Sequence, residues 1–347
     1  MTTVSEFRRA LQYLRKQKYH LIGGHSAVKK CYWVHKALLE GRFCYKAKFY
    51  GIESHRCAQF SPAVLWCWNS CLHCWRYRPQ DRGSWGEVML ETVDDPRFIV
   101  DMVVKEHART VSGYKMFSNV SEDMYREARN PKHVAISLTG EATLYPLLDD
   151  LIAEFHRRGM TTFLVTRGVR PEVIANLGVE PTQLYVSIEA FDYESYIEFN
   201  RPMSKSLWKR TLESLELLPS FTCPTVVRVT IVKSFNANDR AIREWSRMLS
   251  VAQPTFIEVK AYMHIGGSIE RLSRQDMPSH SEVREVALKL ADTLGYEAVS
   301  ESKPSRVVLL TRLSKPLVRY GNPPVSWYDK DEGDEYSGEY GSPEEVV

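Results

Sequence analysis

Three cysteines close together in the chain constrain its fold and chemistry more than any other feature. They lie between Trp66 and Trp75 with the spacing Cys-x3-Cys-x2-Cys, at Cys67, Cys71 and Cys74. Three thiolates can bind three corners of a cubic iron–sulfur cluster and leave the fourth iron open. A cluster that only transfers electrons normally has four cysteine ligands, so three ligands indicate that the open iron binds another molecule.

With this spacing, the molecule at the open iron is usually S-adenosylmethionine, bound through its amino and carboxylate groups. An electron from the cluster then cleaves the sulfonium and releases a deoxyadenosyl radical. The alternative is a structural zinc site, which needs a fourth ligand. His73 lies between two of the cysteines, where the chain can hardly fold back to the same metal. The spacing therefore favours the radical cluster over zinc.

A second set of cysteines is evenly spaced, with 12 residues between successive members, at Cys31, Cys44 and Cys57. Zinc fingers use close Cys-x2-Cys pairs, whereas this wide spacing suggests one ligand from each of three successive segments. The set predicts a second cluster whose open iron could hold and polarise a small chelating co-substrate. His25 and His35 are further candidate ligands, although a single histidine is more often a packed or surface residue.

Lys46 follows Cys44 by two residues, and in an extended segment both side chains would lie on the same side of the chain. A lysine beside a cationic site in a partly dry pocket can lose its proton and form a Schiff base with a keto acid. On sequence alone a surface lysine is the favoured interpretation, and Lys48 is equally placed by alternation. The seventh cysteine, Cys223, precedes an apolar run and is interpreted as a buried structural thiol.

Charge is unevenly distributed along the 347 residues, although the net charge is only +3. Residues 1–50 contain 11 Lys and Arg against 2 Asp and Glu, whereas residues 329–347 contain eight acidic residues. The basic segment is a natural surface for a polyanion, or else a solvated face without a partner. The acidic tail has too little apolar content to pack, and we expect it to be disordered.

No apolar run approaches the ~20 residues that a membrane helix needs, and we expect a cytoplasmic protein. Seven cysteines in such a chain indicate metal or redox chemistry rather than disulfides, because the cytosol keeps thiols reduced. Three parts are expected. They are a basic N-terminal extension with the second cysteine set at residues 1–57, a barrel at residues 58–320, and an acidic tail at residues 321–347.

Short β-branched runs alternate with helical stretches from about residue 60, which is typical of an α/β protein with a mainly parallel sheet. Six strands are expected, at residues 63–66, 133–138, 161–166, 183–188, 225–232 and 256–262. Six units fit a partial (βα)6 barrel, with the chemistry at the carboxyl ends of the strands. Further elements are expected as helices near residues 4–14, 146–158 and 281–292 and as a closing strand pair at residues 296–302 and 306–312.

These residues together resemble the radical S-adenosylmethionine (SAM) family and, within it, the tRNA 4-demethylwyosine synthases. The resemblance covers nearly the whole folded part, and both cysteine sets in this order make it specific. The matching runs are residues 25–29, 44–46, 49–51, 54–57, 74–76, 137–142, 199–202, 228–230, 256–262 and 305–309. Departures occur at His73, Arg167 and Glu189, where the family more often has another aromatic residue, asparagine and aspartate.

The resemblance implies a carbon–carbon lyase that modifies N1-methylguanosine at position 37 of tRNA, beside the anticodon. The deoxyadenosyl radical would take hydrogen from the methyl group, and the carbon radical would add to pyruvate. Loss of the pyruvate carboxylate and ring closure would give the tricyclic base 4-demethylwyosine. The longer eukaryotic relatives carry a flavodoxin-like domain that these residues lack, which implies a separate electron donor such as flavodoxin or ferredoxin. A monomer is expected.

The resemblance also implies two 4Fe-4S clusters, SAM as cofactor, and roles for individual residues. The cluster ligands are Cys67, Cys71 and Cys74 for the radical cluster, and Cys31, Cys44 and Cys57 for the auxiliary cluster. The candidate cofactor contacts are Gly140, Glu141, Ala142, Ser187 and Arg228. Lys46 matches the lysine proposed to engage pyruvate, which reverses the preference for a surface lysine. Binding of pyruvate as an imine and binding by the auxiliary iron both stay open.

Two rival interpretations predict different metal contents. Another radical SAM RNA-modifying enzyme, such as a methyltransferase, or an activase, would share the first cysteine set and the cofactor. A non-catalytic, metal-stabilised RNA-binding module would contain zinc. About eight irons per chain are expected if both clusters form and about four if only one forms.

Overall fold

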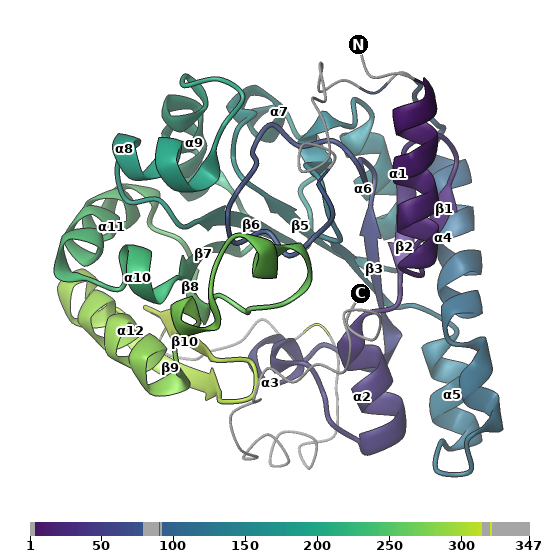
Figure 1. Ribbon diagram of the computed structural model, residues 1–347. Helices are drawn as coiled ribbons and strands as arrows, with labels where there is room; N and C mark the ends of the chain where they lie inside the picture. The colour runs from purple at the N-terminus through teal and green to yellow at the C-terminus, as the bar shows by residue number, and fades with distance from the viewer. Residues whose placement is uncertain (1–3, 79–89, 91, 314–319, 321–347) are drawn as a thin grey trace.

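The computed structural model describes residues 4–78, 90, 92–313 and 320, and its centre is one ten-stranded sheet (Figure 1). The strands lie side by side in the order β1-β2-β3-β4-β5-β6-β7-β8-β10-β9. Their bounds are β1 His20–Ile22, β2 Ser26–Lys29, β3 Cys57–Ser61, β4 His133–Ile136, β5 Thr161–Thr166, β6 Gln183–Ile188, β7 Thr225–Ile231, β8 Phe256–Ala261, β9 Glu297–Ser302 and β10 Val307–Thr311. The expected acidic tail lies outside the described residues.

Strands β3 to β8 are parallel neighbours, and helical crossovers connect each of them to the next. These six strands confirm the expected partial barrel. The antiparallel hairpin β1–β2 extends the sheet beside β3, and the antiparallel pair β10–β9 extends it beside β8. The sequence predicted the closing pair but missed the hairpin, so the N-terminal residues contribute two unexpected strands to the same sheet.

The helices are bounded by recognisable sequence signals. For example, Ser279 and Glu282 form a capping box at the start of α12, and Gly295, with φ of +66°, ends it. The bounds are α1 Val4–Lys16, α2 Tyr32–Glu40, α3 Tyr45–Tyr50, α4 Pro96–Thr110, α5 Glu122–Ala128, α6 Leu148–Arg157, α7 Pro171–Ala175, α8 Tyr193–Ser195, α9 Leu207–Glu216, α10 Lys233–Asn236, α11 Asp239–Ala252 and α12 His280–Leu294. Within the described ranges, none of these helices combines the length and apolar character that a transmembrane helix requires.

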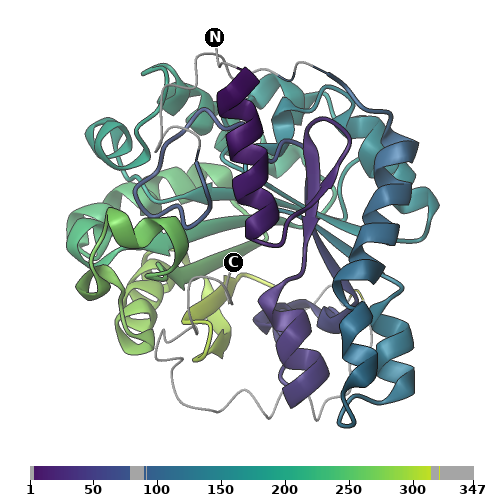
Figure 2. The ribbon, with the colours of Figure 1, turned by 45° about the vertical axis from the view of Figure 1, so that its right-hand side comes forward.

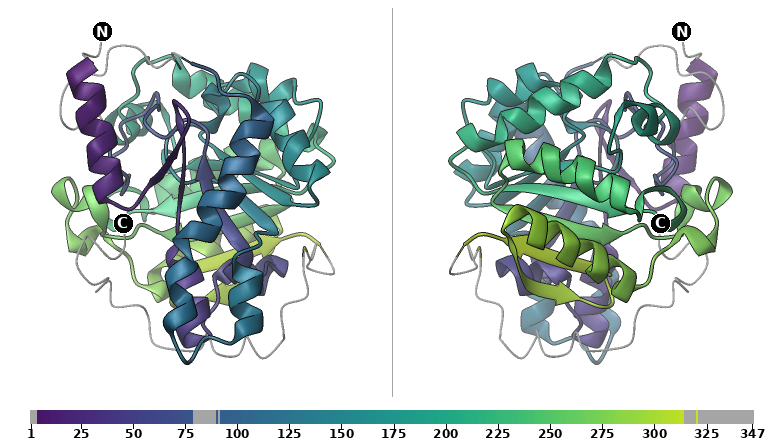
Figure 3. Two further views of the ribbon diagram at one scale, coloured as in Figure 1. Left: turned by 90° about the vertical axis from the view of Figure 1, so that its right-hand side faces the viewer. Right: turned by 90° about the vertical axis from the view of Figure 1, so that its left-hand side faces the viewer.

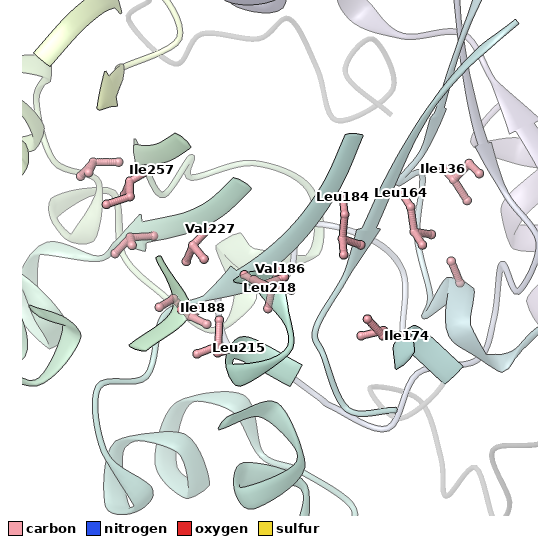
Figure 4. Close-up of a cluster of buried hydrophobic side chains, with 14 of the residues drawn as sticks. Ile136, Leu164, Ile174, Leu184, Val186, Ile188, Leu215, Leu218, Val227 and Ile257 are labelled. Carbon is pink, nitrogen blue, oxygen red and sulfur yellow. The ribbon is translucent and has the colours of Figure 1, made fainter. Parts of the chain in front are cut away.

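The outer face of the sheet packs against α4, α6, α11 and α12 through one continuous apolar core. Figure 3 shows α11 and α12 covering this face, and Figure 4 shows the strand side chains that point toward the helices, which include Ile136, Leu164, Leu184, Val227 and Ile257. Successive strand residues point to opposite faces of a sheet. The intervening residues therefore line the inner face, where the chemistry of the molecule is found.

The inner face is closed at one end by α3, whose aromatic side chains pack against the strands. Tyr45, Phe49 and Tyr50 share an apolar cluster with Phe163 of β5 and Tyr185 of β6. This helix contradicts the extended segment that the alternation around Lys46 suggests. The aromatic residues of α3 bury against the inner face, which a straight extended segment would not allow.

The expected first strand at residues 63–66 is also wrong, because β3 ends at Ser61. The Ser61 hydroxyl accepts a hydrogen bond from Ala63 N (3.1 Å) and donates one to Thr139 O (2.6 Å), which turns the chain out of the sheet. Residues 63–66 are instead buried against Ala10 and Leu14 of α1. Their apolar character reflects contact with a helix and not strand pairing.

Replacement of Leu164 by alanine tests the outer core. Leu164 is 0% exposed, so Leu164→Ala should lower the free energy of unfolding by about 2–5 kcal/mol in urea denaturation. Leu288→Ala on α12 is the matched control, because Leu288 is 40% exposed and its loss should cost below about 1 kcal/mol. Equal losses in the two variants would contradict this packing.

Candidate active site

The loop after β3 carries the first cysteine set and is fixed to a segment far away in the sequence. Leu72 N donates a hydrogen bond to Phe199 O (2.9 Å), and Ser70 N donates one to Asn200 O (3.0 Å). The acceptors lie at the end of a single π-helical turn, Tyr196–Asn200. Such turns are frequently found at functional sites. The position of the cysteine loop therefore depends on the connection that follows β6.

The three thiols of this loop lie within electrostatic reach of one another, with Cys71 buried and Cys67 and Cys74 partly buried. Burial raises the pKa of Cys67 well above its usual value, and negative charge on Cys71 adds to the effect. Burial likewise raises the pKa of Cys71 to about 11, with Cys74 contributing in the same direction. Asn200 Nδ2 donates a hydrogen bond to Cys71 Sγ (3.3 Å). A bound metal replaces the thiol proton. These three thiols are therefore suited to bind three irons of an iron–sulfur cluster as thiolates.

Gly140 brings the end of β4 against the cysteine loop. Its φ is +70°, and an added Cβ would lie 1.9 Å from Ala63 O and 2.8 Å from Trp66 O. Glu141 N donates a hydrogen bond to Trp66 O (2.8 Å), and the charge of Glu141 raises the pKa of Cys67. Only glycine permits this approach. The strand edge at Gly140–Ala142, matched to the cofactor amino group, therefore lies beside the first cysteine set.

The Glu141 carboxylate is fully buried and joins the ends of two strands. Its Oε1 accepts hydrogen bonds from the hydroxyls of Thr143 (2.8 Å) and Thr166 (2.7 Å), and its Oε2 accepts one from Arg167 N (2.9 Å). The hydrogen bonds of the Glu141 side chain thus fix the conformation of the Gly140–Ala142 strand edge. The backbone of this edge is then available to bind the cofactor. Ser187, another candidate cofactor contact, is buried on β6.

A second buried carboxylate, Glu189, was noted in the sequence only as a departure from the family pattern and not as a candidate site residue. Arg167 Nη1 donates to Glu189 Oε1 (2.7 Å), His73 Nε2 lies 3.1 Å from the same oxygen, and Asn200 Nδ2 donates to Oε2 (3.2 Å). Burial alone would raise the pKa of Glu189, but the charges of Arg167 and His73 outweigh it and lower the pKa. The three departures from the family pattern, His73, Arg167 and Glu189, therefore contact one another and form one network.

The second cysteine set comes together at the starts of three elements. Cys31 precedes α2, Cys44 precedes α3, and Cys57 begins β3. Burial, with charge on Cys31 acting in the same direction, raises the pKa of Cys44 and of Cys57 to about 12. The Lys46 ammonium lowers the pKa of all three thiols. The fold thus places these three thiols and Lys46 within electrostatic reach of one another, although the cysteines belong to three successive segments.

No group of three or more His, Cys, Asp or Glu side chains in the described ranges converges as needed for a single metal ion. A cubic cluster has a different requirement, because each thiolate binds its own iron.

The candidate ligand His25 uses both ring nitrogens within the fold. Its Nδ1 donates to Pro62 O (2.5 Å), and its Nε2 accepts from Asp94 N (3.0 Å). The other candidate, His35, lies with its Nδ1 2.6 Å from the Tyr114 hydroxyl. Cys223, expected to be buried, is only partly buried and packs against the outer core.

Lys46 lies over the aromatic inner wall of the barrel. Its Nζ is 4.3 Å from the ring centroid of Tyr185 and 5.1 Å from that of Phe163, and burial lowers its pKa. Its side chain forms no hydrogen bond or ion pair with any described residue. In a helix, residues two apart lie about 200° apart around the axis. The helical form of α3 therefore separates Lys46 from Lys48, which the sequence could not do.

Arg228 on β7 belongs to the same inner wall. Its Nε donates to Glu258 Oε2 (2.9 Å), and its Nη2 donates to the Tyr45 hydroxyl (3.2 Å). Glu258 on β8 also accepts hydrogen bonds from the hydroxyls of Tyr50 (2.9 Å) and Tyr185 (3.3 Å). The sequence analysis missed Glu258. The available signal was a glutamate and a lysine, Glu258 and Lys260, on one side of an otherwise apolar strand.

The fold and this site define a class of protein. Residues 62–246 match the family model described as Radical SAM superfamily, and residues 251–312 match the one described as Wyosine base formation. The chain is thus a radical SAM protein. The superfamily uses a 4Fe-4S cluster and SAM, in agreement with the first cysteine set and the glycine-containing strand edge.

Relatives identify the family within this class. The S-adenosyl-L-methionine-dependent tRNA 4-demethylwyosine synthase of Pyrococcus horikoshii is 46% identical over 305 residues, which cover 87% of this chain and 88% of the relative. The enzyme of the same name from Methanocaldococcus jannaschii is 42% identical, with 88% of this chain and 96% of the relative covered. The chain belongs to the tRNA 4-demethylwyosine synthase family.

Solved structures agree with this assignment. A structure of TYW1 with a lysine-pyruvate adduct bound has a TM-score of 0.80 and 38% identity, and the match covers 90% of this chain and 97% of that one. The crystal structure of archaeal TYW1 has a TM-score of 0.73 and 36% identity, with 92% and 100% covered. The relative from Arabidopsis thaliana is longer, because the match covers 87% of this chain but only 46% of that protein.

Replacement of Gly140 by alanine tests the contact between β4 and the cysteine loop. Gly140→Ala should lower the free energy of unfolding and the iron bound after anaerobic reconstitution, because Cβ would collide with the loop backbone. Gly159→Ala is the matched control, since Gly159 has the same φ of +70° and nothing within 4 Å of an added Cβ. The control should lose about 1 to 2 kcal/mol of stability and no iron. Equal iron content in the two variants would refute the role of Gly140.

Proposed function

We propose that this chain condenses N1-methylguanosine 37 of tRNA with pyruvate to form 4-demethylwyosine, using SAM and two 4Fe-4S clusters. One observation carries the proposal beyond family membership. The second cysteine set and Lys46 lie near one another on the inner face of the barrel, and the loop after β3 carries the first set. A reaction in which a SAM-derived radical activates one substrate for addition to a second, small substrate needs two such neighbouring sites.

The first site would bind the radical cluster through Cys67, Cys71 and Cys74. When bound, this cluster supplies the electron that cleaves SAM. The strand edge at Gly140–Ala142 would orient the cofactor through its backbone, and the buried Ser187 would contact it from β6. The network around Glu189 holds the loop against the ends of the strands, because Asn200 bonds to both Glu189 and Cys71.

The second site would bind pyruvate at Lys46, beside an auxiliary cluster held by Cys31, Cys44 and Cys57. The Lys46 amine is a nucleophile on the inner wall that can attack a ketone carbon, and Tyr185 and Phe163 shield it from bulk water. The lysine-pyruvate adduct of the similar TYW1 structure supports this role. Attack on the ketone carbon with loss of water would fix the two-carbon donor in place.

The tRNA would bind across α1, which carries exposed basic side chains beside the cysteine loop. Arg9, Arg15 and Lys16 are exposed, whereas Ala10 and Leu14 pack on residues 63–66 of the loop. Figure 2 shows α1 on the near side of the sheet, next to the β1–β2 hairpin. Phosphate contacts from this face would guide the anticodon loop to the site. We further propose that the enzyme is a cytoplasmic monomer that meets its tRNA there and receives electrons from a separate donor such as flavodoxin or ferredoxin.

The decisive assay combines the reconstituted protein with reductant, SAM, pyruvate and tRNA that contains N1-methylguanosine. Mass spectrometry should detect the tricyclic nucleoside, and iron analysis should give about eight irons per chain. Cys67→Ala should abolish deoxyadenosine formation. Lys46→Ala should retain it but form no tricyclic product, because only the second substrate loses its site.

Other outcomes of this assay would favour the rival functions. Deoxyadenosine without the tricyclic base, whatever the two-carbon donor, would indicate another radical SAM RNA-modifying enzyme. About four irons would indicate a single cluster, and zinc would indicate the non-catalytic RNA-binding module. Equal loss of deoxyadenosine in Cys67→Ala and Lys46→Ala would contradict separate roles for the two sites.

Substitution of Arg15 tests the proposed RNA surface. Arg15→Gln should weaken tRNA binding roughly threefold to tenfold and reduce the salt slope by about one, because one phosphate contact is lost. Arg243→Gln is the matched control, since Arg243 is exposed on α11, on the outer face of the sheet (Figure 3). Filter binding at several salt concentrations measures both variants. A similar loss in both would show only a general effect of net charge.

A further inference from the structure

We propose that Arg228 binds the carboxylate of the keto-acid co-substrate whose ketone carbon reacts with Lys46, and that this pair of side chains selects α-keto acids. This inference rests on the proposed function and extends it. It also gives Arg228 a role different from the contact with SAM that the resemblance implies.

Lys46 and Arg228 lie on the same aromatic side chain. The Lys46 Nζ is 4.3 Å from the ring centroid of Tyr185, and the Arg228 Cζ is 5.0 Å from it. Lys46 comes from α3 and Arg228 from the middle of β7, so the packing of α3 on the inner face brings the two cations together. In an α-keto acid the ketone carbon and the carboxylate are directly bonded. Binding of such a molecule between the two side chains would place its ketone carbon at Lys46 and its carboxylate at Arg228.

Hydrogen bonds hold Arg228 in place and leave one of its nitrogens available. Nε and Nη2 donate to Glu258 and to the Tyr45 hydroxyl, whereas Nη1 has no partner among the described residues. The Arg228 side chain is 18% exposed, so a small molecule can reach it. A fixed guanidinium with a free N–H edge is well suited to bind a carboxylate.

Cationic side chains outnumber carboxylates on this part of the inner wall. Lys46, Arg228 and Lys260 lie there, and Glu258 is the one carboxylate in the described part of the chain that bonds to any of them. The thiolates of the second cysteine set would balance part of this charge. An anionic co-substrate would balance more of it, and buried charges are stable only when paired.

Lys260 is less suited to bind the carboxylate. Its Nζ already donates to Ser305 O (2.8 Å) and lies over the ring of Tyr45 at 4.9 Å, not over Tyr185. Lys260 thus provides a matched control. It is a cationic residue of the same wall, one strand away from Arg228, and its ammonium already has a partner within the fold.

The covalent step is balanced and needs no oxidant or reductant. The Lys46 amine attacks the ketone carbon, its two N–H protons pass to the carbonyl oxygen, which leaves as water, and an imine forms. The carboxylate keeps its charge and stays paired with Arg228. Borohydride then delivers a hydride to the imine carbon, and the nitrogen takes a proton, so the adduct becomes a stable amine that mass spectrometry can count.

The test titrates the reconstituted holoenzyme with pyruvate or with its uncharged methyl ester, traps the imine with borohydride and measures the intact mass. Wild-type protein should reach half-maximal adduct at a lower concentration of pyruvate than of methyl pyruvate. Arg228→Gln should need roughly 10- to 100-fold more pyruvate and lose the preference over the ester, because one charge-assisted interaction is removed. Arg228→Lys keeps a cationic partner for Glu258 and should be intermediate. Lys260→Gln should keep the wild-type preference.

Each remaining outcome overturns the inference in an identifiable way. A wild-type titration and preference in Arg228→Gln would remove Arg228 from the pyruvate site. An unchanged pyruvate titration with a raised KM for SAM would make Arg228 a cofactor contact. Absence of any trapped adduct in the wild type would overturn both this inference and the role of Lys46. In that case the appearance of the tricyclic nucleoside still decides the proposed function separately.

Discussion

Burial of thiol groups that need a metal in order to ionise is the constraint on which the rest of this structure depends. Cys44, Cys57 and Cys71 all have a pKa of about 11 or 12, so at neutral pH they would stay protonated without iron. Metal binding removes those protons and is therefore coupled to the free energy of folding. The glycine approach at β4 and the packing of α3 both keep these groups away from water.

Two buried carboxylates organise the charge around these thiols. Glu189 collects Arg167, His73 and Asn200 at the ends of the strands, and through Asn200 it is linked to Cys71. Glu258 forms a similar network on the inner wall, where its hydrogen bonds connect α3 and β7 to β8. A buried carboxylate is tolerated only when its hydrogen bonds are satisfied, and both meet this condition. Each network fixes side chains that a bound substrate or cluster would meet.

The sequence predicted most strands because their signals are local. Short β-branched runs located β4 to β10 closely, whereas residues 63–66 were misread because burial against α1 produces the same apolar run. The carboxylate networks were missed since they are long-range: Tyr50 and Glu258 are 208 residues apart. Read singly, His73 and Glu189 looked like isolated departures from a family pattern, but in the structure they contact each other.

The hydrogen bonds between the first cysteine loop and residues 199 and 200 set an order for the biogenesis of the protein. A ribosome finishes residues 67–74 long before it reaches Asn200, so the emerging loop lacks the backbone acceptors that give it its final form. The loop can therefore take its final form only after residue 200 has been synthesised. We expect the cluster to be loaded after that point in maturation.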